Sequence, residues 1–324
     1  LAGSRGAFAF LLLLGCTFAG LSSAQLAGVA LQSIEVDGVQ RTFKVFDPGN
    51  LGDVPAPVVF VLHGGGGDAD LISDFFFEGR WNELAHLNRF FVVYPEGRDN
   101  PGGDGGHHWN DCRPGDEILD PEILSTEDDV AYLSALIDWV GWAYLIDPAR
   151  VYLAGMSNGG LMALRAAAEI GDRLAAVSVV AAAPLASSEC GAAGVPLPIL
   201  FMHGTADDHI RVGGGCIGDT AQCALGSTLP VQDGLDFWIN LNGTDVTPAL
   251  VQIPDFVPED NSTVDVFTYA HGVGNTEVVY YRVNGGGHNV PGADPLDAEM
   301  ELELGTKNRD IVAAREIWGF FARH

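Results

Sequence analysis

The most constraining feature of this chain is a serine between two glycines, at a point where a strand gives way to a helix. Residues 151–154 are rich in β-forming side chains, residues 155–159 read Gly-Met-Ser-Asn-Gly, and residues 161–170 have a helical pattern. A turn this sharp forces a strained backbone on its serine, and side chains two positions away would collide with the neighbouring strand or helix. The pattern predicts that the Ser157 hydroxyl is exposed above a sheet, at the positive end of a helix. A chance Gly-rich turn is the alternative for this motif alone.

Strand-like and helix-like segments alternate along the rest of the chain. A hairpin is expected at residues 33–46, which alternate in polarity around Asp37 and Gly38. Residues 57–62 are a continuous apolar run, which is typical of a strand buried on both faces. Further strands are expected at residues 90–94, 151–154, 175–181, 199–202 and 277–283, and helices at residues 80–88, 127–144, 161–170, 232–240 and 310–321. This order predicts an α/β protein with a mostly parallel central sheet and helices on both faces.

Composition allows one large core and argues against two classes of partner. The chain has 324 residues, of which 47% are hydrophobic. Its 43 acidic residues against 16 lysines and arginines give a net charge of −27. An acidic surface repels the phosphates of nucleic acids and of anionic lipids, so we expect neither as a partner. The sequence carries no signal for a particular oligomeric state.

The N-terminus has the pattern of a signal peptide. Arg5 supplies a positive charge, and residues 7–14 are an apolar run too short to span a bilayer. We expect residues 1–24 to be removed by cleavage after Ala24, which leaves residues 25–324 as a single domain. The alternative is a lipobox that ends at Cys16 and leaves a lipid anchor there. Either route predicts secretion or export to the periplasm, and no other stretch is apolar enough for a membrane span.

Export would place the other four cysteines in an oxidising compartment, where disulfides form. Cys112, Cys190, Cys216 and Cys223 permit three pairings. We favour Cys216–Cys223, which closes a short Gly-rich loop, together with Cys112–Cys190, which ties two longer loops. Four free buried thiols are the alternative. No C-x-x-C pair is present, so we expect no metal site.

Residues 63–67 read His-Gly-Gly-Gly-Gly and directly follow the expected strand at 57–62. Glycines there let backbone N–H groups approach a substrate oxygen. The N–H groups of Gly65 and of Asn158, the residue after the serine, would together form an oxyanion hole. A phosphate-cradling loop is the alternative, but such loops use a lysine that this stretch lacks.

Two further strand ends supply an acid and a base. Asp207 follows the strand at 199–202 and would orient a histidine and stabilise its charged form, whereas the adjacent Asp208 is a candidate turn cap. His288 ends the run Asn-Gly-Gly-Gly-His after the last expected strand and would act as general base. The chain order Ser157, Asp207, His288, with the glycine loop upstream, is the order of α/β-hydrolases.

Seven stretches resemble one known family over most of the chain. They are VVFVLHGGGGDAD (58–70), FVVYPEG (91–97), DDVAYLSALID (128–138), RVYLAGMSNGGLMA (150–163), LFMHGTAD (200–207), GGGHNVPG (285–292) and AREIWGFFARH (314–324). The chain resembles the secreted polyhydroxybutyrate depolymerase-like esterases, which are related to feruloyl and acetylxylan esterases. The resemblance implies the α/β-hydrolase fold, a Ser157–Asp207–His288 triad and an oxyanion hole at the glycine loop. It implies a serine esterase without cofactor or metal, acting on hydroxyalkanoate esters or oligomers, or on acyl groups of plant polysaccharide.

Four residues are candidates for substrate contact: His63 and Gly64 in the glycine loop, Trp109 in a long polar loop, and Val290. Relatives often carry tryptophan where this chain has Val290, so we expect a wider acyl pocket or the loss of a stacking surface. Trp109 has an alternative, which is packing within its own loop near Cys112.

Two other functional classes remain open at this stage. A secreted peptidase of the same fold would be separated by a comparison of ester and amide substrates. A non-catalytic binding protein on a hydrolase scaffold would show the loss of a triad member, and all three residue types are present here.

Overall fold

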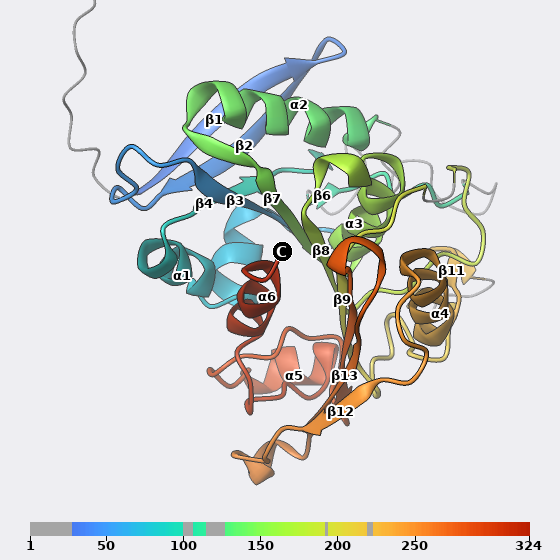
Figure 1. Ribbon diagram of the computed structural model, residues 1–324. Coiled ribbons are helices and arrows are strands. Elements are labelled where there is room, and N and C mark those ends of the chain that lie inside the picture. Colours follow the sequence, from blue (N-terminus) through green and yellow to red (C-terminus); the bar gives the residue numbers. More distant parts are fainter. Residues whose placement is uncertain (1–27, 100–105, 115–126, 192–193, 219–222) are drawn as a thin grey trace, which may run out of the picture.

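A ten-stranded sheet forms the centre of the computed structural model, which describes residues 28–99, 106–114, 127–191, 194–218 and 223–324 (Figure 1). Its strands are β1 (Gly28–Val36), β2 (Val39–Asp47), β3 (Ala56–Leu62), β4 (Phe91–Pro95), β7 (Ile146–Met156), β8 (Ala176–Val180), β9 (Ile199–Gly204), β12 (Ala249–Gln252), β13 (Thr263–Tyr269) and β14 (Val278–Asn284). They follow the order β1-β2-β4-β3-β7-β8-β9-β14-β13-β12. The central strands from β4 to β14 are parallel, which confirms the predicted mostly parallel sheet. Two small antiparallel pairs are β5 (Arg98–Asp99) with β6 (His107–His108), and β10 (Gly215–Cys216) with β11 (Ser227–Thr228).

Antiparallel strands complete both edges of the sheet. β1 and β2 form the predicted hairpin, and its turn residues Asp37 and Gly38 have φ values of 52° and 80°. Positive φ at both positions is what a two-residue turn between twisted strands requires. At the other edge β13 pairs with β14, and β12 pairs with β13. Neither strand is predicted from the sequence; β12 is a four-residue edge strand whose side chains are all exposed and therefore carry no burial pattern.

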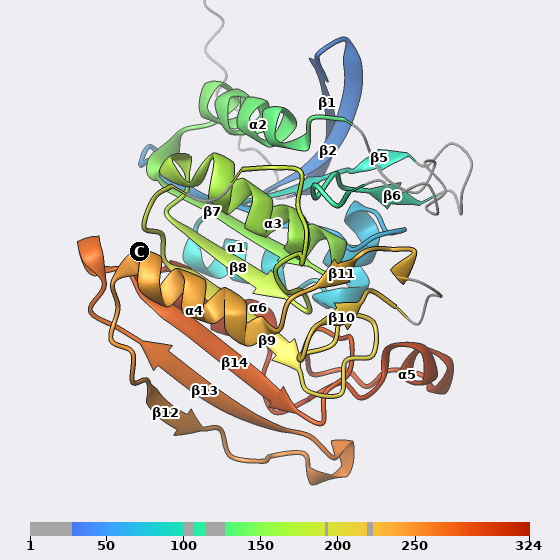
Figure 2. The same ribbon diagram turned by 90° about the vertical axis from the view of Figure 1, so that its right-hand side faces the viewer.

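Helices cover both faces of the sheet, as predicted. They are α1 (Arg80–Asn88), α2 (Asp129–Ala143), α3 (Asn158–Glu169), α4 (Val231–Asn242), α5 (Ala298–Leu304) and α6 (Ala313–Phe321), with short helical turns at residues 71–76, 171–173, 258–260 and 273–275. Figure 2 shows α2, α3 and α4 over one face, and α1 and α6 pack on the other. Asp128 caps α2 because its carboxylate accepts a hydrogen bond from the Ala131 N–H at 3.0 Å. The short helix α5 is not predicted from the sequence.

The strand β3 shows why a continuous apolar run belongs at the centre of this fold. Val58, Phe60 and Leu62 point into the core beneath α2, α3 and α4, whereas Val59 and Val61 point into the core beneath α1 and α6. Every residue of β3 is buried. A strand between two helical layers therefore needs apolar side chains on both of its faces.

Both predicted disulfides are present. Cys112 pairs with Cys190 and Cys216 pairs with Cys223, with Cα–Cα distances of 5.7 and 4.6 Å. The predicted signal peptide, residues 1–24, and the candidate lipidation site Cys16 lie outside the described residues. Among the described residues, no helix has the length and apolar character needed to cross a bilayer.

Loss of the Cys112–Cys190 bridge should cost more stability than loss of the Cys216–Cys223 bridge. A disulfide restricts the unfolded chain, and this effect grows with the sequence separation, which is 78 residues for the first bridge and 7 for the second. We expect replacement of both Cys112 and Cys190 by alanine to lower the free energy of unfolding by about 4 kcal/mol. Replacement of both Cys216 and Cys223 by alanine should lower it by about 2 kcal/mol. Urea unfolding of the two double variants measures the difference, and equal losses would contradict this expectation.

Candidate active site

The turn between β7 and α3 holds Ser157 in a strained conformation. Its φ of 55° and ψ of −122° lie outside the regions that non-glycine residues favour. A Cβ atom on Gly155 would lie 2.1 Å from the Gly159 oxygen, and one on Gly159 would lie 2.3 Å from the His63 oxygen. Both glycines of the motif are therefore required by the close approach of β3, β7 and α3.

Two hydrogen bonds join the side chains of Ser157, His288 and Asp207. His288 Nε2 lies 2.9 Å from Ser157 Oγ, and His288 Nδ1 lies 2.8 Å from Asp207 Oδ2. In a neutral imidazole with this arrangement, Nδ1 donates to the carboxylate and Nε2 accepts from the hydroxyl. The three residues follow β7, β9 and β14, whose carboxyl ends meet at one edge of the parallel sheet. The structure thus brings together the three residues that the sequence motifs single out.

The Asp207 carboxylate is buried but well supplied with hydrogen-bond donors. Its Oδ1 accepts from the backbone N–H groups of His209 and Ile210 at 2.9 and 2.8 Å. Burial raises the pKa of Asp207, but the hydrogen bond from His288 and the charges of His288 and His203 outweigh it and hold the pKa below its usual value. An ionised carboxylate at this position can orient His288 and stabilise its charged form.

The glycine loop at residues 63–67 lies directly against Ser157. A Cβ on Gly64 would lie 3.4 Å from the Ser157 Cβ, and one on Gly65 would lie 3.5 Å from the Asn158 Cβ. In the part of the chain that the structure describes, the backbone N–H groups of Gly65 and Asn158 donate to no protein acceptor. Asn158 is the first residue of α3, so its N–H also belongs to the positive end of the helix dipole. Two N–H groups beside the serine are the arrangement that a developing oxyanion needs.

The side chain of Asn158 ties the start of α3 to the loop that carries Trp109. Its Oδ1 accepts from the Trp109 N–H at 2.7 Å, and its Nδ2 donates to the Trp109 oxygen at 3.1 Å and to Asp111 Oδ2 at 2.7 Å. The Trp109 indole N–H donates to the His63 oxygen at 2.9 Å, and the whole side chain is buried. Trp109 therefore packs within its loop, the alternative that the sequence leaves open, and it supports the glycine loop from behind.

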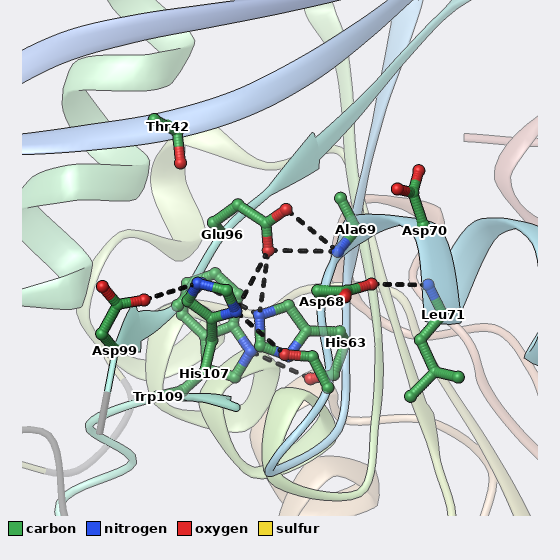
Figure 3. A network of polar contacts seen from close by, with 12 residues as sticks. Thr42, His63, Asp68, Ala69, Asp70, Leu71, Glu96, Asp99, His107 and Trp109 are labelled. Carbon is green, nitrogen blue, oxygen red and sulfur yellow. Dashed lines mark hydrogen bonds and ion pairs between the residues drawn. The ribbon is translucent and has the colours of Figure 1, made fainter. Parts of the chain in front are cut away.

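A network of polar side chains lies behind the glycine loop (Figure 3). Glu96 accepts from the Ala69 N–H at 3.1 and 3.2 Å, and its Oε2 lies 3.8 Å from His63 Nε2 and 3.7 Å from His107 Nδ1. His107 Nε2 pairs in turn with Asp99 at 2.7 Å. Burial raises the pKa of Glu96. The network anchors the residues that follow the glycine loop to the segment after β4.

Two further candidates for substrate contact, His63 and Val290, are buried like Trp109. His63 Nε2 accepts from the Gly97 N–H at 2.9 Å, and its Nδ1 donates to the Gly64 oxygen at 2.7 Å. Both ring nitrogens are thus engaged with the backbone, so the ring shapes the loop and offers no polar atom to a substrate. Burial lowers the pKa of His63 to about 4, which keeps the ring neutral near pH 7. Val290 is only 1% exposed and packs in the core beneath α1 and α6.

Two features beside the site have little signal in the sequence. The ring of His209 stacks on that of His288, with centroids 4.8 Å apart. Glu78 accepts from the N–H groups of residues 293–294 at 3.0 and 2.9 Å and pairs with Lys307 Nζ at 2.7 Å. Glu78 therefore anchors the segment that follows His288. Its place in the chain, more than 200 residues before that segment, gives no local pattern that would reveal this contact.

More than half of the chain matches a known protein family. A family profile described as phospholipase/carboxylesterase matches residues 50–225, which is more than half of the chain. This chain belongs to that family. The matched segment contains the glycine loop, Ser157 and Asp207, and it ends before His288.

Named relatives confirm the resemblance that the sequence motifs indicate. The chain is 31% identical over 242 residues to NocK of Nocardia uniformis subsp. tsuyamanensis, provisionally described as an esterase, which covers 73% of this chain and 66% of that protein. It is 31% identical over 174 residues to the bifunctional acetylxylan esterase/xylanase XynS20E of Neocallimastix patriciarum, covering 54% of this chain and 22% of that protein. It is 26% identical over 235 residues to poly(3-hydroxyalkanoate) depolymerase C of Paucimonas lemoignei, covering 72% of this chain and 50% of that protein. The chain thus spans between about a fifth and two thirds of the length of these relatives.

A solved structure supports the fold. The acetyl xylan esterase from Aspergillus awamori superposes with a TM-score of 0.52 and 16% identity, covering 85% of this chain and 98% of that one. At this identity the likeness concerns the fold alone. Together with the strand order and the family match, it confirms the predicted α/β-hydrolase fold.

The stability of the protein should fall below pH 6.5 in a way that depends on His63. Burial lowers the pKa of this ring from 6.5 to about 4, so between these pH values the unfolded chain binds a proton that the folded chain does not. The contribution of His63 to folding is therefore complete above pH 6.5 and is lost as the pH falls toward 4. We expect a loss of about 3 kcal/mol in the free energy of unfolding.

Denaturant unfolding between pH 4 and pH 7 measures this effect. Because glutamine does not titrate in this range, His63→Gln should flatten the pH dependence. His271→Gln is the matched control, since the His271 side chain is 81% exposed, and it should follow the wild type. A His63→Gln variant that keeps the wild-type slope would show that other groups cause the loss.

Proposed function

We propose that this chain is a secreted serine carboxylic ester hydrolase in which Ser157 is the nucleophile. The observation that carries the proposal is the hydrogen-bonded series Asp207–His288–Ser157, at 2.8 and 2.9 Å, beside the N–H groups of Gly65 and Asn158. Membership of the phospholipase/carboxylesterase family and the names of the relatives support ester chemistry.

The proposed reaction passes through an acyl-enzyme. Ser157 Oγ attacks the ester carbonyl carbon while its proton passes to His288 Nε2. The carbonyl oxygen becomes negatively charged and accepts hydrogen bonds from the Gly65 and Asn158 N–H groups. When the tetrahedral intermediate collapses, His288 returns the proton to the departing alcohol oxygen.

Hydrolysis of the acyl-serine repeats these steps with water. His288 takes a proton from the water as its oxygen attacks the acyl carbon, and the same N–H groups stabilise the second oxyanion. Collapse returns the proton to Ser157 Oγ and releases the carboxylic acid. Asp207 remains ionised and holds His288 in the tautomer that accepts from the serine. Every step uses groups of this chain, so the proposed route requires no cofactor and no metal.

We propose short hydroxyalkanoate esters or their oligomers as substrates. The match to poly(3-hydroxyalkanoate) depolymerase C supports this choice, because it covers 72% of the chain. Acyl groups on plant polysaccharide are the second candidate, and the match to an acetylxylan esterase/xylanase supports them.

We also propose that residues 1–24 direct export and that residues 25–324 form a single catalytic domain. The two disulfides support export, because such bonds persist in oxidising compartments. Cleavage after Ala24 gives a soluble protein, and lipidation of Cys16 remains the alternative.

Replacement of Ser157 by alanine should abolish ester hydrolysis. We expect kcat on p-nitrophenyl butyrate to fall by at least about 10⁴-fold in Ser157→Ala, and by about 10³–10⁴-fold in Asp207→Asn because His288 loses its orienting carboxylate. Ser33→Ala changes an exposed serine on β1 and should keep the wild-type rate. Wild-type turnover in a folded Ser157→Ala protein would overturn the proposed nucleophile.

A substrate panel should separate the candidate activities. We expect kcat/KM to be higher for a 3-hydroxybutyrate oligomer than for methyl ferulate or acetylated xylan. A preference for either plant-wall substrate would support the second candidate instead. Faster cleavage of a peptide amide would indicate a peptidase. No turnover of any substrate by folded protein would favour a binding protein on a hydrolase scaffold.

A further inference from the structure

We propose that His209 is a positioning residue that holds the His288 imidazole in its reactive orientation. This inference rests on the proposed ester hydrolysis. The two rings are stacked, with centroids 4.8 Å apart and an angle of 17° between their planes. The His288 side chain is 6% exposed and the His209 side chain is 38% exposed, so His209 is the outer ring of the pair.

The stacked ring supplies a restraint that the hydrogen bonds of His288 do not. Those bonds act at the two ring nitrogens, Nδ1 toward Asp207 and Nε2 toward Ser157. Such bonds fix the two nitrogens, but because their angular preference is broad they only weakly resist tilting of the ring out of its plane. A flat ring packed on one face of His288 opposes that tilt. Proton transfer depends on this alignment, since small misplacements of a catalytic group reduce its efficiency.

Three polar contacts hold His209 in place, one through its side chain and two through its backbone. Its ring Nδ1 lies 2.9 Å from Asp208 Oδ1, and its backbone N–H donates to Asp207 Oδ1 at 2.9 Å. Its backbone oxygen accepts from the Gly218 N–H at 2.6 Å, within the loop that the Cys216–Cys223 disulfide closes. One turn of the chain therefore supplies both the carboxylate that orients His288 and the ring that covers it.

A second Asp–His pair in the chain provides a matched control. His271 Nδ1 lies 2.7 Å from Asp245 Oδ2, which resembles the His209–Asp208 pair. His271 precedes β14, whereas His288 follows it, so the two histidines lie at opposite ends of that strand. Loss of the His271 ring removes a similar surface pair without touching the proposed site.

The test compares His209→Ala, His209→Phe and His271→Ala on p-nitrophenyl butyrate. In His209→Ala we expect kcat to fall by about 10-fold and KM to change by less than about twofold, because only the orientation of His288 is lost. In His209→Phe we expect kcat to recover to within about threefold of the wild type, because phenylalanine keeps a flat ring on His288. His271→Ala should match the wild type.

The outcomes separate this inference from the proposed function. An inactive wild type, or a fully active Ser157→Ala protein, would overturn the proposed function. Activity that depends on Ser157 but is unchanged in His209→Ala would overturn the positioning role. Equal losses of kcat in the alanine and phenylalanine variants would also overturn the positioning role, because a stacked ring would then make no difference to kcat.

A measurement without turnover provides a second readout. Proton NMR can follow the downfield resonance of the hydrogen on His288 Nδ1, which faces Asp207 at 2.8 Å. We expect this resonance to broaden in His209→Ala and to recover in His209→Phe, because the ring is held less firmly without a stacked partner. An unchanged resonance in folded His209→Ala protein would contradict the inference even if no ester substrate were found.

Discussion

The close approach of three backbones at the end of β3, the end of β7 and the start of α3 fixes the arrangement of the whole site. A Cβ at Gly155 or Gly159 would lie 2.1–2.3 Å from backbone oxygens, so the strained Ser157 lies where three elements pack backbone against backbone. Because the glycine loop continues directly from β3, the same contact brings its N–H groups beside the serine. The proposed nucleophile and the proposed oxyanion hole are therefore positioned by one packing constraint.

Buried polar groups then make the glycine loop rigid. His63 is bonded through both ring nitrogens, Trp109 donates to the His63 oxygen, and Asn158 binds Trp109 through both atoms of its amide. Buried polar atoms without partners are costly, so this set of bonds strongly favours one conformation of the loop. In the proposed reaction, a loop held in this way would present its N–H groups without reorganisation, which is how preorganised donors stabilise an oxyanion.

The sequence predicts the elements with strong local patterns and misses those that depend on distant contacts. The continuous apolar run of β3 and the Asp-Gly hairpin have physical causes within a few residues, and both predictions are confirmed. The disulfide pairing is also confirmed. Cys216 and Cys223 are 7 residues apart in the sequence, so their pairing closes a short loop. The strands β12 and β13 are missed; β12 lies at the edge of the sheet, and its exposed side chains carry no burial pattern. His209 has no motif of its own, and only the fold places its ring on His288.

The sequence by itself determined which residue types we propose for the chemistry, because the serine, the acid, the histidine and the glycine loop each follow a strand in the order of an α/β-hydrolase. The carboxyl ends of parallel strands meet at one edge, so residue types and spacing are enough to indicate that these groups gather there. The tertiary structure alone decided which of the candidate neighbours are buried behind the proposed site. His63, Trp109 and Val290 are candidates for substrate contact in the sequence, yet all three are buried. The physical reason is that burial depends on which layers pack against a residue, and that contact joins segments far apart in the chain.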